Sequence, residues 1–195
     1  IAEAFEQIVR WAQAPGMPEG ALDRLEGILS HAWMGERDPD VHGRIAQAVE
    51  ALAWFEASRG QAPRVASLVV SLGVAAPDPP WKATALQELI QRLAVPARMT
   101  HLLMLLHGMD KVQAAERILP LLKLLGAQAA DFLVERLSEE GDRMRRARLL
   151  EALRSCGQTA EGPLLEALHA PEWFVVRNAL IVLGEVAGPS RLADV

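Results

Sequence analysis

The chain has 195 residues, which is enough for one or two ordinary domains or for a short array of repeats. Because 51% of the residues are apolar and 23% are charged, the composition predicts a packed core and excludes a wholly disordered chain. The formal net charge of −5 disfavours a duplex-binding protein, since nucleic-acid affinity comes mainly from clustered Lys and Arg that neutralise phosphates.

The single cysteine, Cys156, excludes an internal disulfide and a metal site built from several thiolates. It predicts a reducing compartment, the cytoplasm. No stretch has the roughly 18 to 20 consecutive apolar residues that a membrane span needs, and the first residues lack the pattern of a signal peptide. The sequence begins with Ile1 and ends at Val195 within an unfinished pattern, so we expect a fragment of a longer polypeptide.

The first hundred residues show the helical period of apolar side chains in nearly every segment. Asp38 and Pro39 are typical of a helix start, as cap and first residue, and Gly60 is expected to end that helix. The run "SLVVSLGV" fits a strand or a helix, and its helical neighbours favour a helix. The predicted helices span 1–13, 19–33, 39–60, 63–72 and 80–94.

From about residue 95 the helices repeat with a period of 31 residues. Gly126, Gly157 and Gly188 are each 31 residues apart, and each is suited to the end of a helix. Pro120 is expected to kink its helix or to delay its start. Four apolar positions follow the same shift: Leu102, Leu133 and Leu164; Leu106, Leu137 and Leu168; Ile118, Leu149 and Leu180; Leu119, Leu150 and Ile181.

Each repeat contains two short helices, which cannot bury both of their apolar faces alone. Neighbouring pairs must therefore stack, and this predicts an all-α, superhelical α-solenoid. Residues 1–60 are expected to form an irregular helical cap or a smaller module, and residues 61–195 the repeat array. Its clearest units are 95–125, 126–156 and 157–188.

The stretch "GQTAEGPLLEALHAPEWFVVRNALIVLGEVAG" resembles a bacterial HEAT-like repeat of the type named after phycobilisome lyases. The resemblance is carried by the initial glycine, by "PLLEAL" on the first helix and by "VVRNALIVLGEV" on the second. It is close over the last two units and looser over the rest of the array, and it does not extend to residues 1–60. It implies helix pairs whose second helices line the concave groove of the solenoid.

At about 100° per residue, the last helix has Leu180 at the centre of its predicted core-facing arc. This orientation places Trp173 in the core and Arg177 at its edge, where the guanidinium would reach carbonyl groups of the adjacent turn. Asn178 falls on the opposite side, beside Glu185. The predicted protein-binding strip of the groove contains eight residues: Glu116, Lys123, Glu151, Arg154, Val175, Asn178, Val182 and Glu185.

Catalytic and metal-binding motifs are not evident in the sequence. The five histidines lie apart and none precedes a glutamate, so isolated surface or boundary imidazoles are expected, with no metal and no cofactor. No phosphate-binding glycine loop or nucleophile elbow occurs. The Trp residues are expected to pack in the core or between repeats.

The segment "GDRMRRARLLEALRS" carries five arginines, and HEAT-like DNA glycosylases hold duplex DNA in a basic groove. These arginines spread around the helix and have acidic neighbours, which favours neutralisation over a phosphate track. We therefore expect a non-catalytic scaffold or regulatory module, bacterial and cytoplasmic, that binds a protein or peptide along its groove. The alternative is a nucleic-acid-processing enzyme such as a DNA glycosylase, and a lyase or pigment-binding role is suggested by the family name alone.

Overall fold

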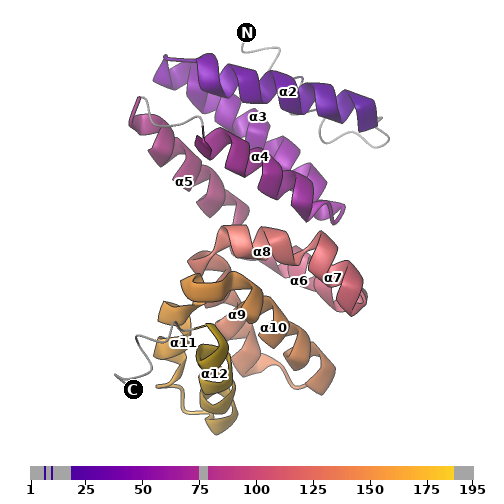
Figure 1. Cartoon of the computed structure of the whole chain (residues 1–195), viewed down its shortest axis with the longest axis vertical. Helices are drawn as coiled ribbons and strands as arrows, with labels where there is room; N and C mark the ends of the chain where they lie inside the picture. The colour runs from indigo at the N-terminus through magenta and orange to yellow at the C-terminus, as the bar shows by residue number, and fades with distance from the viewer. Residues whose placement is uncertain (1–6, 8–9, 11–18, 75–78, 187–195) are drawn as a thin grey trace. The chain divides into compact units, whose positions relative to one another are not determined.

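The computed structural model describes residues 7, 10, 19–74 and 79–186, and almost all of these residues lie in helices (Figure 1). No strand occurs in these ranges, so the prediction of an all-α chain is confirmed, and "SLVVSLGV" is helical. Apart from residues 7 and 10, the expected helix over residues 1–13 lies outside the described residues, as do the loop residues 75–78 and Gly188. None of the described helices has the length and apolar character needed to cross a membrane.

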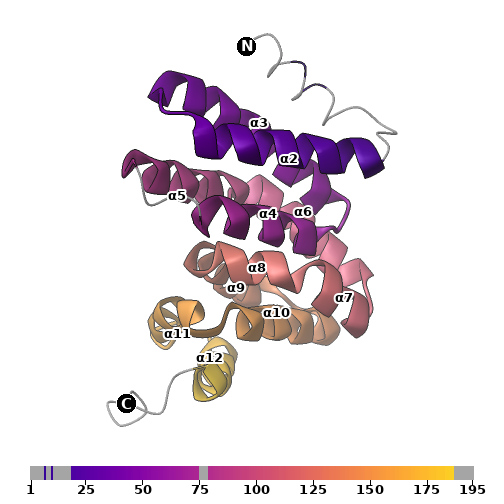
Figure 2. The same ribbon diagram turned by 45° about the horizontal axis from the view of Figure 1, so that its top comes forward.

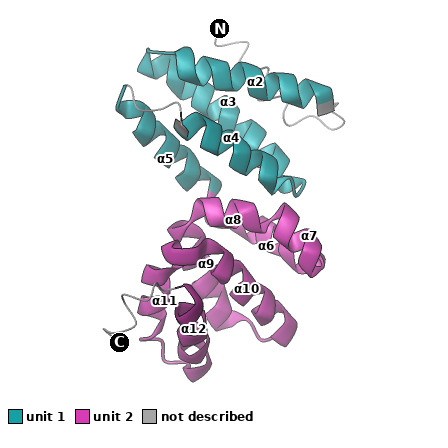
Figure 3. Ribbon diagram, viewed as in Figure 1, with its two compact units in different colours: residues 1–93 teal, residues 94–195 magenta. Residues whose placement is uncertain are grey.

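The chain divides into two compact units, residues 1–93 and 94–195 (Figure 3). The predicted boundary near residue 60 falls inside unit 1, whereas unit 2 coincides with the three clearest repeats of the sequence. Unit 1 contains α2 (Glu19–Gly35), α3 (Pro39–Ser58), α4 (Ala62–Val74) and α5 (Trp81–Leu93). Within it, α2 contacts α3 and α4, and α3 contacts α4 and α5.

Local sequence signals set the ends of α3. The Asp38 side chain accepts hydrogen bonds from the backbone N–H groups of Asp40 and Val41, at 2.8 and 3.2 Å, and Pro39 opens the helix. At the other end, Gly60 adopts a φ of 70°, a left-handed conformation that glycine reaches without strain. Both predicted boundaries of this helix are confirmed.

Unit 2 contains α6 (Pro96–Gly108), α7 (Lys111–Arg117), α8 (Leu119–Leu125), α9 (Ala127–Glu139) and α10 (Arg143–Cys156), then the short 3₁₀ turn η1 (Gly157–Ala160), α11 (Glu161–Ala167) and α12 (Trp173–Val186). We call α6, α9 and α11 the first helices, and α7, α8, α10 and α12 the second helices. Consecutive first helices contact one another, α6 with α9 and α9 with α11. Consecutive second helices do the same, α8 with α10 and α10 with α12 (Figure 2).

Pro120 lies at the second residue of α8, and the chain breaks its helix at Ile118, which has φ −127° and ψ −45°. Proline has no N–H to donate to the carbonyl oxygen four residues earlier, and its ring crowds that carbonyl, so one helix becomes the two short helices α7 and α8. The predicted interruption at Pro120 is confirmed.

The 31-residue shift holds between α8 and α10. Gly126 and Gly157 end these helices with the same φ of 61°. Three buried residues of α8 and of the position before it, Ile118, Leu121 and Leu122, correspond to Leu149, Ala152 and Leu153 of α10, which are also buried. The two helices therefore present the same positions to the core.

The shift shortens by one position between α10 and α12. The stretch from Gly126 to Arg143, which opens α10, is one position longer than the stretch from Gly157 to Trp173, which opens α12. Because one residue corresponds to about 100° of helix rotation, the shorter stretch turns α12 by about 100° from the orientation that the 31-residue shift predicts. Three of the buried residues of α12, Ala179, Val182 and Leu183, accordingly correspond to Leu149, Ala152 and Leu153.

Candidate interaction surface on the second helices

An open groove of about 570 Å³ lies along α10 in unit 2. Its lining consists of Lys111 from α7 and of Met144, Ala147, Arg148, Glu151 and Arg154 from α10. The α10 residues recur at intervals of a helical turn, so they form one face of the helix. Met144 is 72% exposed in the middle of these charged side chains. The groove thus combines an accessible apolar side chain with basic and acidic groups.

The charged groups of this groove hold one another in place. The Glu151 carboxylate lies 3.1 Å from the Arg148 guanidinium and 3.8 Å from the Lys111 ammonium. Arg148 also donates a hydrogen bond of 3.0 Å to the carbonyl oxygen of Met109, in the turn after α6. Lys111 remains largely exposed, so its ammonium group is accessible to a partner.

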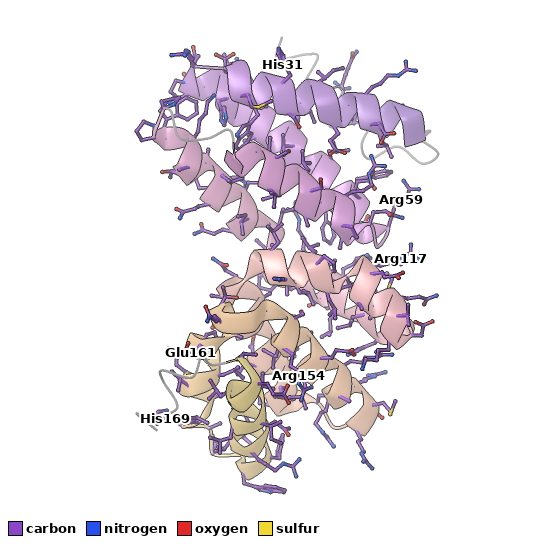
Figure 4. The ribbon with its side chains drawn as sticks, viewed as in Figure 1. His31, Arg59, Arg117, Arg154, Glu161 and His169 are labelled. Carbon is purple, nitrogen blue, oxygen red and sulfur yellow. The ribbon has the colours of Figure 1, made fainter. Side chains whose placement is uncertain are left out.

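Arg154 and Glu185 connect consecutive second helices. Arg154 lies on α10 (Figure 4), and its Nε and Nη2 both donate hydrogen bonds to the Glu185 carboxylate of α12, the second over 3.1 Å. The hydrogen bond from Arg154 holds the pKa of Glu185 below its usual value, so the carboxylate is ionised at neutral pH. The structure therefore brings together two of the residues predicted for the strip.

Glu116 on α7 and Lys123 on α8 lie 31 residues before two positions of α10. The 31-residue shift aligns them with Ala147 and Arg154, and both side chains are exposed. Glu151 is partly buried in the groove between Lys111 and Arg148. The structure thus places Glu116, Lys123, Glu151, Arg154 and Glu185 at accessible or groove-lining positions.

The prediction that Val175, Asn178 and Val182 face the groove is wrong, because the structure buries all three in unit 2. The expected orientation rested on Leu180, which the 31-residue shift pairs with the buried Leu149. Leu180 is instead 49% exposed, since the shorter turn before α12 rotates the helix by one position. Leu180, Ile181 and Glu185 are exposed on α12, and Glu185 meets the groove residue Arg154.

Arg177 also differs from its expected role. Its guanidinium lies 5.1 Å from the centre of the exposed Trp173 ring, and it donates a weak hydrogen bond of 3.4 Å to the Asn178 side chain. The role predicted for Arg177 is found at Arg146, which donates to the carbonyl oxygens of Glu140 and Gly141, at 2.8 and 2.7 Å. Trp173, expected in the core, lies on the surface.

Unit 1 contains a group of buried polar side chains whose burial is not among the predictions from sequence. His42 is buried between Trp33 and Trp81, with ring centres 4.2 and 4.7 Å away. Beside it the buried Lys82 ammonium donates to the carbonyl oxygens of Trp33 and Met34, at 2.9 and 2.7 Å. His42 is thus not the surface or boundary imidazole that was expected. A groove of about 560 Å³ runs between α3 and α5 next to this cluster.

The sequence does hold a signal for this cluster. His42 precedes Ile45, Val49 and Leu52 at the spacing of one helix face, and Lys82 precedes Leu89 and Leu93 in the same way. Burial and the nearby Lys82 lower the pKa of His42 to about 4, so its imidazole is neutral at physiological pH. The arrangement joins the end of α2 to α5 and offers no exposed reactive group.

The described residues hold no group of three or more His, Cys, Asp or Glu side chains that could bind a metal ion. His31 and His169, for example, lie in different units (Figure 4). Burial raises the pKa of the Cys156 thiol to about 12, so the reactive thiolate is not populated at neutral pH. Cys156 is therefore a core residue of α10. No protein-family model matches this chain, and no curated protein matches it either.

Proposed function

We propose that the chain is an α-solenoid of HEAT-like helix pairs that serves as a non-catalytic scaffold or regulatory module. Two sets of contacts in unit 2 support the solenoid: consecutive first helices contact one another, and so do consecutive second helices. Each helix pair therefore packs against the next pair, as in a solenoid. The equivalent conformations of Gly126 and Gly157 support a true repeat. In this proposal the protein is bacterial and cytoplasmic.

The proposed binding surface is the second-helix face, which we define as the exposed or groove-lining residues Lys111, Glu116, Lys123, Met144, Ala147, Glu151, Arg154, Leu180, Ile181 and Glu185. The observation that carries the proposal is the groove along α10, where Met144 is exposed among charged side chains. Accessible apolar side chains within a polar surround are typical of surfaces that bind another protein. Leu180 and Ile181 extend this apolar character onto α12.

A library of displayed peptides tests this proposal on the intact chain. Peptides selected on the purified protein are expected to lose binding when Met144→Glu or Ile181→Glu is introduced, because either change places a charge where the partner's apolar side chain is desolvated. Met104→Glu is the matched control, since Met104 on the first helix α6 is 65% exposed. Selected peptides that bind all three variants equally would show that this face is not the binding surface.

The alternative of a nucleic-acid-processing enzyme has less support. Of the five arginines of α10, Arg146 and Arg148 hold backbone carbonyl groups, and Arg154 pairs with Glu185. A glycosylase-like reaction requires a carboxylate free to act in a basic groove. The groove carboxylate, Glu151, is engaged by Lys111 and Arg148.

A further inference from the structure

We infer that the partner of the second-helix face is an acidic peptide segment that also carries apolar side chains. This inference rests on the proposed function and specifies the chemistry of its partner. It begins from the way in which charge is distributed between the two layers of helices in unit 2.

The second helices of unit 2 are strongly basic, although the whole chain has a formal charge of −5. They carry nine Lys and Arg residues against three glutamates, Glu116, Glu151 and Glu185. The nine cations are Lys111, Arg117, Lys123, Arg143, Arg145, Arg146, Arg148, Arg154 and Arg177. Arg146 and Arg148 hold backbone carbonyl groups and Arg154 pairs with Glu185, but all nine keep their positive charge, and such an excess on one layer attracts and orients an acidic partner.

The first helices of unit 2 have the opposite balance. They carry five acidic residues against two cations, Arg98 and Arg136. The acidic residues are Asp131, Glu135, Glu139, Glu161 and Glu166. The positive charge is therefore a property of one layer, the layer that contains the groove, and not of the unit as a whole.

Two features favour an acidic peptide over a nucleic acid. Met144, Leu180 and Ile181 are large exposed apolar side chains on the basic layer, and a phosphate backbone cannot bury them favourably. Glu151 and Glu185 also interrupt the cations of this layer, whereas duplex binding depends on clusters of Lys and Arg that neutralise successive phosphates. A peptide that alternates carboxylates with Leu or Phe satisfies both the cations and the apolar side chains.

Four fluorescent probes of similar length test the inference on the intact chain by anisotropy. The probes are a peptide of alternating Glu and Leu, the same peptide with Lys in place of Glu, the same peptide with Ser in place of Leu, and a duplex DNA oligonucleotide. The Glu-Leu peptide is expected to bind at least about tenfold more tightly than the other probes, and its affinity is expected to fall with added salt.

Two double variants locate the binding. Lys111→Glu with Arg143→Glu is expected to weaken binding of the Glu-Leu peptide at least about tenfold, since Lys111 lines the groove and the exposed Arg143 directly precedes the groove residue Met144. Both positions open helices of the basic layer. Acidic residues are favourable in the first turn of a helix, so folding is retained, and circular dichroism checks this. Arg98→Glu with Arg136→Glu makes the same change in net charge on the first helices and is expected to leave the affinity unchanged.

The inference would be overturned by equal binding of the Lys-Leu peptide, by tighter binding of the duplex, by no binding of the Glu-Leu peptide, or by equal losses in the two double variants. These outcomes separate it from the proposed function. If library-selected peptides are neutral or basic and still require Met144, the second-helix face binds peptides and only the acidic character of the partner is wrong.

Discussion

The two units use polar side chains in different ways. In unit 1 three ionisable residues, His42, Glu56 and Lys82, are buried within the helix packing. In unit 2 the buried polar residue among those described is the uncharged Asn178, while the charged side chains line the surface of the second helices. A buried polar group is costly unless it is satisfied, so it restricts how helices pack, whereas an exposed one remains available to a partner. Substitution of these polar side chains is thus predicted to change mainly the stability of unit 1 and mainly the binding of a partner to unit 2.

Lys82 and Arg146 give the sharpest test, because each donates two hydrogen bonds to the carbonyl oxygens of a neighbouring segment. Lys82 is 1% exposed, whereas Arg146 is only partly buried. Lys82→Ala removes a buried stem and leaves carbonyl groups of α2 without this donor, so we expect a loss of about 3–4 kcal/mol in the free energy of unfolding. Arg146→Ala is expected to cost about 1 kcal/mol, since water replaces the donor there.

Denaturant unfolding of both variants, followed by tryptophan fluorescence, measures this difference. Lys82→Met is the matched control, because it keeps the apolar stem and removes only the ammonium group. Its loss should lie between those of the two alanine variants. Equal losses for Lys82→Ala and Arg146→Ala would mean that burial does not distinguish the two units.

His42 makes the stability of unit 1 dependent on pH. Its pKa is lowered to about 4, first by burial and then by Lys82, with Glu36 acting in the opposite direction. The unfolded chain therefore binds a proton at a higher pH than the folded chain, and the stabilising contribution is complete above about pH 6.5. It is lost as the pH falls from about 6.5 to 4, by up to about 3 kcal/mol.

Unfolding curves measured from pH 7 to pH 4 check this prediction against two variants. His42→Phe keeps an aromatic ring between Trp33 and Trp81, and its stability should fall less over this range than that of the unmodified chain. His31→Phe makes the same substitution at an exposed histidine of the same unit and is the matched control. If all three proteins lose stability in parallel, His42 does not contribute to the acid sensitivity.

Two neighbouring residues of α12 test the shortened register of this helix in unit 2. Val182 is fully buried and Leu180 is half exposed. Val182→Ala is expected to lower the free energy of unfolding by about 2 kcal/mol through the cavity it leaves, whereas Leu180→Ala should change it by less than about 0.5 kcal/mol. The reverse order, measured by the same denaturant titration, would support the 31-residue register that places Leu180 in the core.

Much of the fold follows from sequence because its signals are local. The helical period, the Asp38 cap, the break near Pro120 and the glycines at 126 and 157 each act within a few residues. The assignment of Glu116, Lys123, Glu151 and Arg154 to a binding strip stays a prediction; the structure shows these residues exposed or lining the groove. The shift of 31 predicted Glu185 on the same surface, where Arg154 meets it.

The errors arise where a tertiary property overrides the local pattern. A turn shorter by one position before α12 is invisible to a fixed period, yet it rotates the helix and buries Val175, Asn178 and Val182. His42 and Lys82 are buried because α2 packs against them. Both are polar residue types, which are usually exposed, although each occupies a position on the apolar face of its helix. Alignment of the helix starts, Arg143 with Trp173, would have corrected the first error.

The smallest expected effect on stability, and the most informative one for binding, concerns Arg154 and Glu185. Both side chains are exposed, so replacing either should leave the melting temperature unchanged within error. Their effects on the Glu-Leu peptide should be opposite. Arg154→Gln removes a cation that an acidic partner uses, and a weakening of about two- to fivefold is expected. Glu185→Gln removes the carboxylate that occupies Arg154, so binding should become tighter by a similar factor. If both changes weakened binding of the Glu-Leu peptide, the intact Arg154–Glu185 ion pair would be part of the contact surface. The second-helix face would then bind a mixed-charge partner instead of an acidic one.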